Sequence, residues 1–296
     1  MVGMIIKNIK KYSSQQAGSD IKDSVLTVPA HWGFKAKFAL INAAAIADLN
    51  VLGIVNENSA AAIHFAITRN DSEPVNIGFF NMGSHNLQIS IVQFFGTYDT
   101  VKEKNIESMK VLSHVSIPNF GGLQFDELLA EHVAAEFKAK HKIDVHENLK
   151  SWTKLISKCS DLKETLSANK EANIYIEGLI DGIDLNVNVK REVIEKSPMF
   201  EKLQEYLQQA LDKAGISKSD MNSVEVIGGG SRVPLIGKIL KDFFDPVEVG
   251  SHINGDESMA FGAALRAANL SIAFRVKQLH FYDGNPETIR AVVTNI

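Results

Sequence analysis

The stretch from Val224 to Phe244, VEVIGGGSRVPLIGKILKDFF, constrains the fold of this chain more than any other. Its apolar start runs into three glycines, and Pro234 then opens a segment whose apolar residues recur at the spacing of one helix face. The pattern predicts a strand, a glycine turn and a helix. Glycines allow close backbone approach to a ligand, and a helix start offers N–H groups to anions. Arg232 could stack on a flat base, although a tight strand-to-helix connection alone would also account for the glycines.

The N-terminal third predicts a βαβ unit with a parallel strand pair. Its strands are expected at 24–28 and 51–55, with a helix at 35–48 between them. Two further strands, 75–82 and 87–94, are joined by a Gly-Ser-His-Asn turn whose backbone amides could surround a phosphate. The remaining expected elements are a strand near 111–115, a helix carrying Phe125 to Phe137, a helix at 151–167, strands at 173–178 and 184–189, and a helix from Met199 that stops at Gly215.

Two predicted helices rich in small residues share a repeated sequence pattern. Asn56-Glu57 precedes Ser59-Ala60-Ala61-Ala62, and Asn254-Gly255-Asp256 precedes a similar run at 258–264. We infer two related halves whose small-residue helices pack with their backbones close together. The alternative is a pair of alanine-rich helices with ordinary acidic N-caps.

Composition narrows the class of protein. With 296 residues, 45% of them hydrophobic, the chain can bury the core of one large or two medium domains. A net charge of −4 argues against nucleic acid, and the single Cys159 excludes an internal disulfide framework. No apolar run is long enough for a membrane span. His141 and His146 lie in a charged segment that indicates a solvated turn rather than a metal site.

The order of motifs resembles the nucleotide-binding domain of the 70-kDa heat-shock chaperones, within the actin-like ATPase superfamily. The segments that carry the resemblance run from about Val25 to Asn269 and include VLTVPAHW, LNVLGIVNENSAAAI, FFNMGSHNLQISIV, FGGLQFDELL, CSDLKETLSAN, VEVIGGGSRVP and INGDESMAFGAA. The segments LSANKEANIYIEGLIDGIDLNVNVKRE and SIAFRVKQLHFYDG are similar to the large members, the 110-kDa group and especially the 170-kDa glucose-regulated, hypoxia up-regulated group of the endoplasmic reticulum. The implied fold is an α/β actin-like (ribonuclease H-like) fold of two lobes.

The resemblance also implies domain boundaries. The family's first strand hairpin and phosphate loop have no recognisable counterpart, so the first subdomain is expected to be incomplete and the chain to be a truncated product or gene model. The expected parts are an unassigned segment at 1–23 that matches nothing in the family, the remainder of lobe I at 24–72, the core of lobe II at 73–120 and 193–270, its outer subdomain at 121–192, and the start of a linker and substrate-binding region at 271–296.

By resemblance, the cleft between the lobes binds ATP or ADP with Mg²⁺ and potassium. Arg232 and the glycine turn would hold the adenosine, Lys163 and Ser167 would contact adenine and ribose, Asp256 would close the site, and Glu57 would orient a magnesium-bound water. The full set of carried-over binding residues is Gly83, Ser84, His85, Asn86, Gly121, Gly122, Lys163, Ser167, Gly228, Gly229, Gly230, Arg232 and Asp256.

Departures from the family pattern bear on hydrolysis. Asn81 and Gln88 stand where the family's phosphate hairpin has two aspartates, and an amide supplies neither a base nor a full charge. ATP hydrolysis is therefore doubtful even where binding is expected. Other departures are Ser160 and Glu164 on the adenosine side, Lys37 in the segment that relays the nucleotide state, and Asn58 after Glu57.

Three functions remain open at this point. The first is an ATP-binding module of a large stress-response chaperone that acts as co-chaperone and nucleotide-exchange factor for a conventional heat-shock partner. It would reach unfolded clients through a substrate domain absent from this chain. The second is an active ATPase that drives client folding, and the third is a truncated interaction module that binds no nucleotide. The resemblance to the large group implies the lumen of the endoplasmic reticulum, with the cytoplasm as the alternative.

Overall fold

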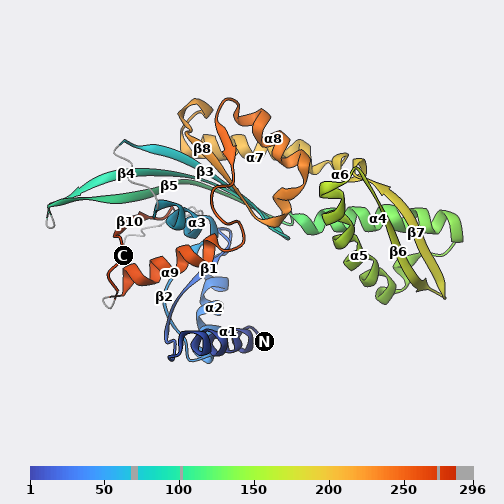
Figure 1. Cartoon of the computed structure of the whole chain (residues 1–296), viewed down its shortest axis with the longest axis horizontal. Coiled ribbons are helices and arrows are strands. Elements are labelled where there is room, and N and C mark those ends of the chain that lie inside the picture. The colour runs from blue at the N-terminus through green and yellow to red at the C-terminus, as the bar shows by residue number, and fades with distance from the viewer. Residues whose placement is uncertain (68–72, 101–102, 272–273, 285–296) are drawn as a thin grey trace, which may run out of the picture.

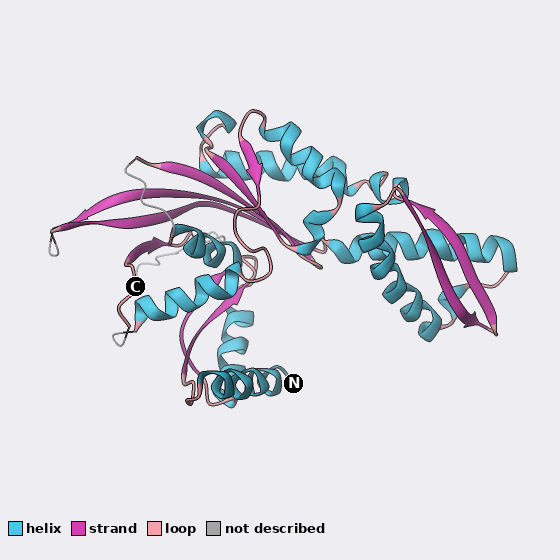
Figure 2. Ribbon diagram, viewed as in Figure 1, coloured by secondary structure: helices cyan, strands magenta, loops and turns pink. Residues whose placement is uncertain are grey.

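A six-stranded sheet forms the centre of the molecule, as the computed structural model of residues 1–67, 73–100, 103–271 and 274–284 shows (Figures 1 and 2). Its strand order is β10-β5-β4-β3-β8-β9. Strands β3, β4 and β5 are antiparallel neighbours, whereas β8, β9 and β10 each pair in parallel. The strands are β3 (Val75–Met82), β4 (Asn86–Asp99), β5 (Lys104–Pro118), β8 (Ser223–Ile227), β9 (Glu248–Gly250) and β10 (Leu279–Tyr282).

Both faces of this sheet are covered, because apolar residues in β3 point both ways. Phe79 and Phe80 are adjacent, so their side chains lie on opposite faces, and each is buried in a different hydrophobic cluster. Helices α7 (Met199–Ala214) and α8 (Pro234–Phe244) belong to the cluster around Phe80, and α3 (Glu57–Ala66) belongs to the cluster around Phe79. The sheet is thus the middle layer of an α/β arrangement.

The outer subdomain projects from one end of the sheet (Figure 1). The chain enters it at the start of α4, next to the β3–β4 turn, and returns from it into α7. Two long helices pack there against a two-stranded antiparallel sheet. The segment predicted as a solvated turn, 138–150, contains the end of the first helix, a short 3₁₀ turn and the start of the second helix. Its elements are α4 (Gly122–His141), α5 (Leu149–Ala168), β6 (Glu171–Ile180), β7 (Ile183–Lys190) and α6 (Glu192–Glu195).

The predicted βαβ unit is confirmed. Strands β1 (Asp23–Val28) and β2 (Asn50–Asn56) pair in parallel, and α2 (Phe34–Ile46) connects them. The preceding segment, expected to remain unassigned, forms α1 (Val2–Ala17), which packs on α2 so closely that a Cβ on Gly3 would lie 3.0 Å from the Ala43 carbonyl oxygen.

The two small-residue helices pack backbone to backbone, as their repeated sequence pattern predicts. A Cβ built on Gly262 of α9 (Ser258–Leu270) would lie 1.7 Å from the carbonyl oxygen of Ala60 in α3. Only a glycine on one helix and small residues on the other permit this approach.

The C-terminal segment expected to begin a linker contributes β10, which pairs with residues 107–110 of β5. Residues 285–296 and 68–72, which fall in the predicted linker and lobe I, lie outside the described residues. No helix within the described ranges is long and apolar enough to cross a membrane.

Candidate nucleotide site

A pocket of about 440 Å³ lies between the glycine turn after β8 and the side of α5. Residues from the β3–β4 turn and from the start of α4 complete its floor. Polar and small residues dominate the lining, which consists of Ser84, Gly122, Asp126, Ser160, Lys163, Glu164, Ser167, Gly229, Gly230, Arg232 and Val233.

The glycine turn lies directly against the β3–β4 turn. Gly228 has a φ of 85°, in the region that favours glycine, and a Cβ there would lie 2.4 Å from the Met82 carbonyl oxygen. A Cβ on Gly230 would lie 2.6 Å from the Gly83 carbonyl oxygen. Gly229 differs, because no atom lies within 4 Å of its Cβ position. Two glycines are therefore needed to pack the turns together, and the third faces open space.

The β3–β4 turn keeps amide donors available. The Gly83 amide donates to the Asn86 carbonyl at 3.1 Å, and the carbonyls of Gly83 and Ser84 accept from the first amides of α4 at 2.9 and 2.8 Å. Within the described residues, the amides of Ser84 and His85 donate to no other group. Neighbouring free amides in a turn are suited to an anion, so this geometry fits the predicted phosphate hairpin.

Lys163 projects from α5 to the start of α4. Its Nζ lies 2.8 Å from Asp126 Oδ1 and donates to the Gly122 carbonyl at 3.0 Å. Burial raises the pKa of the Asp126 carboxyl, and the hydrogen bond and charge of Lys163 partly offset that rise. Asp126 lies in the segment FGGLQFDELL, which carries the family resemblance, but it was not among the predicted site residues. The structure identifies Asp126 as part of the site because its carboxyl group is buried next to the Lys163 ammonium group.

Arg232 lies at the mouth of the pocket, with its side chain 69% exposed. The guanidinium Nη2 lies 3.3 Å from Asp256 Oδ2, which comes from the loop before α9. That loop crosses the glycine turn, because a Cβ on Gly255 would lie 3.5 Å from the Gly228 nitrogen. With 69% of the Arg232 side chain and 70% of the Asp256 side chain exposed, this ion pair is weak on its own.

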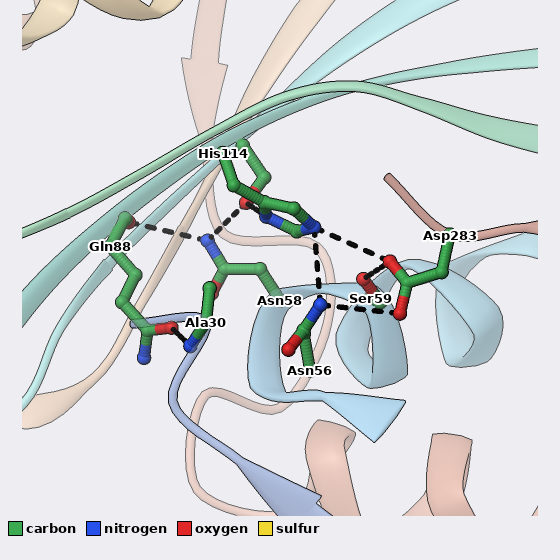
Figure 3. Close-up of polar contacts among 8 residues, drawn as sticks. Ala30, Asn56, Asn58, Ser59, Gln88, His114 and Asp283 are labelled. Carbon is green, nitrogen blue, oxygen red and sulfur yellow. Dashed lines mark hydrogen bonds and ion pairs between the residues drawn. The ribbon is translucent and has the colours of Figure 1, made fainter. Parts of the chain in front are cut away.

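Glu57 lies outside this pocket, on the other side of the hairpin strands. Gln88 Nε2 donates to Glu57 Oε2. Gln88 Oε1 accepts from the Ala30 amide at 2.9 Å (Figure 3). Burial raises the pKa of the Glu57 carboxyl, whereas the hydrogen bond from Gln88 lowers it. The amide at position 88 thus links the end of β1 to the carboxyl group at the start of α3.

A buried polar network continues from this point (Figure 3). Asn58 Nδ2 donates to the carbonyls of Phe79 and Gln88 and to Ser90 Oγ at 3.1 to 3.2 Å. Ser90 Oγ lies 2.7 Å from His114 Nδ1, and His114 Nε2 lies 3.3 Å from Asp283 Oδ1. Asn58, at the position where the resemblance expects proline, therefore holds α3 to the central sheet.

Most of the predicted binding residues come together in the structure. Seven line the pocket, namely Ser84, Gly122, Lys163, Ser167, Gly229, Gly230 and Arg232. Four others contact that lining directly, namely Gly83, Gly121, Gly228 and Asp256. His85, Asn86 and Glu57 do not line it. The lining combines small residues of the glycine turn with polar side chains of α5. For a metal, no group of three or more His, Cys, Asp or Glu side chains suited to hold one lies within the described ranges.

Comparison with known proteins decides the family. The family model described as Hsp70 protein matches residues 1–295. The chain belongs to the Hsp70 family. Because the match begins at residue 1, the expectation that residues 1–23 match nothing in the family is wrong. That segment forms a helix whose apolar residues are mostly exposed and whose buried side is limited to Gly3 and Ile6.

Relatives of this Hsp70 chain include large proteins. It is 34% identical to Heat shock 70 kDa protein 16 of Arabidopsis thaliana, over 98% of this chain and 37% of the relative. It is 35% identical to Hypoxia up-regulated protein 1 of Danio rerio, over 94% of this chain and 29% of the relative. Heat shock protein 88 of Dictyostelium discoideum is 32% identical, over 94% of this chain and 35% of the relative. The chain therefore spans less than half the length of these relatives.

The loop that carries Asp256 in this Hsp70 chain is held by an ion pair that depends on pH. His252 Nδ1 lies 2.7 Å from Glu225 Oε1, the His252 amide donates to Glu225 Oε2 at 2.8 Å, and Nε2 lies 3.6 Å from Glu248. The hydrogen bond and charge of Glu225, whose side chain is 1% exposed, raise the pKa of His252.

We expect the His252→Gln variant to lose part of the pH dependence of stability. A folded-state pKa above the unfolded value of about 6.5 gives stabilisation that is complete below that value and is lost as pH rises through the folded-state pKa. Urea unfolding of parent and variant between about pH 5.5 and 8 measures the difference. The effect should be modest, because 54% of the His252 side chain is exposed. Parallel stability curves for the two proteins would assign the loop's position to other contacts.

Proposed function

We propose that this Hsp70 chain is the ATP- or ADP-binding module of a large heat-shock-type chaperone that assists protein folding. The observation that carries the proposal is the pocket between α5 and the glycine turn, where Arg232 lies at the open edge. Its guanidinium and the floor around Gly229 would hold the adenine, and the free amides of Ser84 and His85 would hold phosphate oxygens. Belonging to the Hsp70 family supports this assignment.

Nucleotide binding, rather than turnover, is the activity that the residues favour. Magnesium would supply charge at the phosphates when nucleotide is bound. Asn81 and Gln88, at the positions that resemble the family's hairpin carboxylates, offer it neutral amides, and Gln88 is engaged with Glu57 and Ala30. The alternative, an ATPase that drives client folding, rests on the half-buried Glu57 carboxyl, whose raised pKa would suit a base.

The proposal extends to the role of the whole protein. Similarity to the large relatives supports a co-chaperone and nucleotide-exchange factor that acts on a conventional heat-shock chaperone partner. We also propose the actin-like arrangement of two lobes for this α/β chain. For its location we propose the lumen of the endoplasmic reticulum. The 35% identity to Hypoxia up-regulated protein 1 of Danio rerio supports that location, and the cytoplasm is the alternative.

Replacing Arg232 with Ala should weaken ADP binding about tenfold, because losing a stacked guanidinium costs on the order of 1.4 kcal/mol. The melting temperature without nucleotide should stay unchanged, since the side chain is largely exposed. Isothermal titration calorimetry with ADP and Mg²⁺ measures the affinity.

Two further variants test whether ADP binding depends on the planar guanidinium of Arg232 or only on positive charge. Arg232→Lys keeps the charge and loses the planar group, so it should behave like the alanine variant. Lys238→Ala removes an exposed charge from the neighbouring helix α8 and should bind ADP as the parent does. Equal ADP affinity in the parent and Arg232→Ala would exclude Arg232 from the site. If ADP neither binds the parent nor raises its melting temperature, the non-binding interaction module becomes the better description.

A further inference from the structure

The connection between α4 and α5 contains a histidine whose two ring nitrogens both face carboxyl groups. His146 Nδ1 lies 2.8 Å from Asp144 Oδ1 in the connection, and His146 Nε2 lies 3.1 Å from Glu131 Oε1 on α4. A neutral imidazole has one N–H donor, whereas a protonated imidazole has two. Only the protonated ring can therefore donate to both carboxylates, because a neutral ring turns one nitrogen lone pair toward an oxygen.

The same ring also contacts α5. The ring centroids of His146 and Trp152 lie 4.3 Å apart, and the two ring planes are tilted by 36°. An indole ring attracts a positive charge placed close to it. His146 thus joins the connection, α4 and α5 at one point, and each of the three contacts is stronger when the ring carries a charge.

The charged groups around His146 keep their charge while the ring titrates. Lys138 Nζ on α4 lies 2.6 Å from Asp144 Oδ2, and Glu147 lies close enough to act on the charge of Lys138. Hydrogen bonds from Lys138 and His146 hold the pKa of the Asp144 carboxyl far below its usual range. Hydrogen bonds to Asp144 and Glu131 raise the pKa of His146. The histidine is therefore the member of this cluster that changes charge at about neutral pH.

We propose that the α4–α5 connection is a pH-sensitive clasp, in which charged His146 holds residues 144–149 against both helices and neutral His146 releases them from Glu131 and Trp152. The pair between Lys138 and Asp144 remains in both forms. Because the folded-state pKa of His146 lies above the ordinary value of about 6.5, the clasp is complete below that value and opens as pH rises through the folded-state pKa.

The position of the clasp separates it from the nucleotide pocket. The pocket is lined by the start of α4 and the second half of α5, whereas the clasp lies where α4 ends and α5 begins. Figure 1 shows that these helices extend into the outer subdomain, away from the central sheet. The clasp therefore makes the stiffness of the outer subdomain depend on pH, with the stiffer form on the acidic side.

Tryptophan fluorescence tests the clasp through Trp152. We expect the emission of the chain to change between about pH 5.5 and 8.5 with a midpoint above about 6.5, because His146 loses its charge beside the indole. His146→Gln should lose this transition. Trp32, the second tryptophan of the chain, is present in every protein compared, so the difference between parent and variant isolates Trp152.

The matched control is His132→Gln. His132 Nε2 lies 3.2 Å from Glu136 Oε1 in the same helix, so this variant removes a histidine–carboxylate pair that lies within α4. It should keep the transition with the midpoint of the parent. Loss of the transition in both variants would show that it does not report the clasp and would overturn the proposal, as would a transition that persists in His146→Gln.

Hydrogen exchange of the unmodified chain provides a readout that needs no variant. After correction for the intrinsic pH dependence of exchange, the amides of residues 144–149 should exchange about twofold to fivefold faster at pH 8 than at pH 6, the range that an exposed ion pair allows. The effect stays within this range because 43% of the His146 side chain is exposed. Equal corrected rates at the two pH values would contradict the clasp.

Discussion

Replacing Gly262 with Ala is expected to lower the free energy of unfolding by about 3 kcal/mol, at the upper end of the range for overpacking a tight contact. The added Cβ would lie 1.7 Å from the Ala60 carbonyl oxygen, and it also approaches the Ala60 Cα at 3.1 Å. Backbone atoms of a helix cannot rotate away as a side chain can, so α3 and α9 must separate. Urea unfolding followed by circular dichroism measures the change.

The matched control for this variant is Gly237→Ala in α8. Gly237 is also inside a helix, but no atom lies within 4 Å of its Cβ position. Alanine there should raise stability by about 0.5 to 1 kcal/mol through helix propensity alone. If both variants change stability by the same small amount, the close packing of α3 on α9 is not what Gly262 provides.

The second large effect is expected in the nucleotide pocket, from Gly230→Ala. A Cβ there meets the carbonyl oxygens of Gly83 at 2.6 Å and Met82 at 2.9 Å, so the glycine turn must move away from the β3–β4 turn. We expect ADP affinity to fall at least tenfold, because both halves of the proposed site shift. Stability should fall by about 1 to 3 kcal/mol, the usual range for overpacking. Calorimetric titration with ADP and urea unfolding give the two quantities.

A substitution at the adjacent Gly229 separates the effect on ADP affinity from the effect on stability. Its Cβ position is open and faces the pocket, so Gly229→Ala should leave stability within about 0.5 kcal/mol of the parent, as surface substitutions usually do. If the glycine floor holds a nucleotide, this variant should lose ADP affinity although it keeps its stability. Unchanged ADP affinity in both variants would contradict the proposed floor.

Strongly patterned segments could be predicted from the sequence. The strand, glycine turn and helix around Gly228 to Pro234 appear as expected, with a 3₁₀ turn in the glycine segment. The parallel pair β1 and β2 and the small-residue helices followed from apolar runs and alanine spacing. Part of the pocket could be named from the residues, because the glycine turn with Arg232 and the turn at Ser84 have a recognisable pattern. The other lining residues that were named, Gly122, Lys163 and Ser167, came only from the family resemblance.

Contacts between distant segments could not be predicted in the same way. The pairing of Lys163 with Asp126 depends on how α4 and α5 face each other, and nothing in either helix signals it. The sequence shows that Gln88 replaces a charged family residue with a neutral one. Its hydrogen bonds to Glu57 and Ala30 could not be predicted, because the three residues lie in segments that are separate in the chain. Helix α1 was missed because its apolar residues are largely exposed and its buried side is narrow.

The way in which the outer subdomain is attached determines how far a local change can be felt. The chain enters the outer subdomain at the start of α4, beside the floor of the pocket. It leaves into α7, where Phe200 stacks on Phe125 of α4 with the ring centroids 5.6 Å apart. Helices α4 and α5 have 20 residues each, about 30 Å at 1.5 Å per residue. The far ends of α4 and α5 therefore lie about a helix length from the pocket, and a rotation at the pocket moves them over a larger distance. A rotation of about 10° at that point would displace the far ends of the helices by about 5 Å, from the same helix rise. Closure of the pocket by a fraction of an ångström would thus become a movement large enough for another protein to detect.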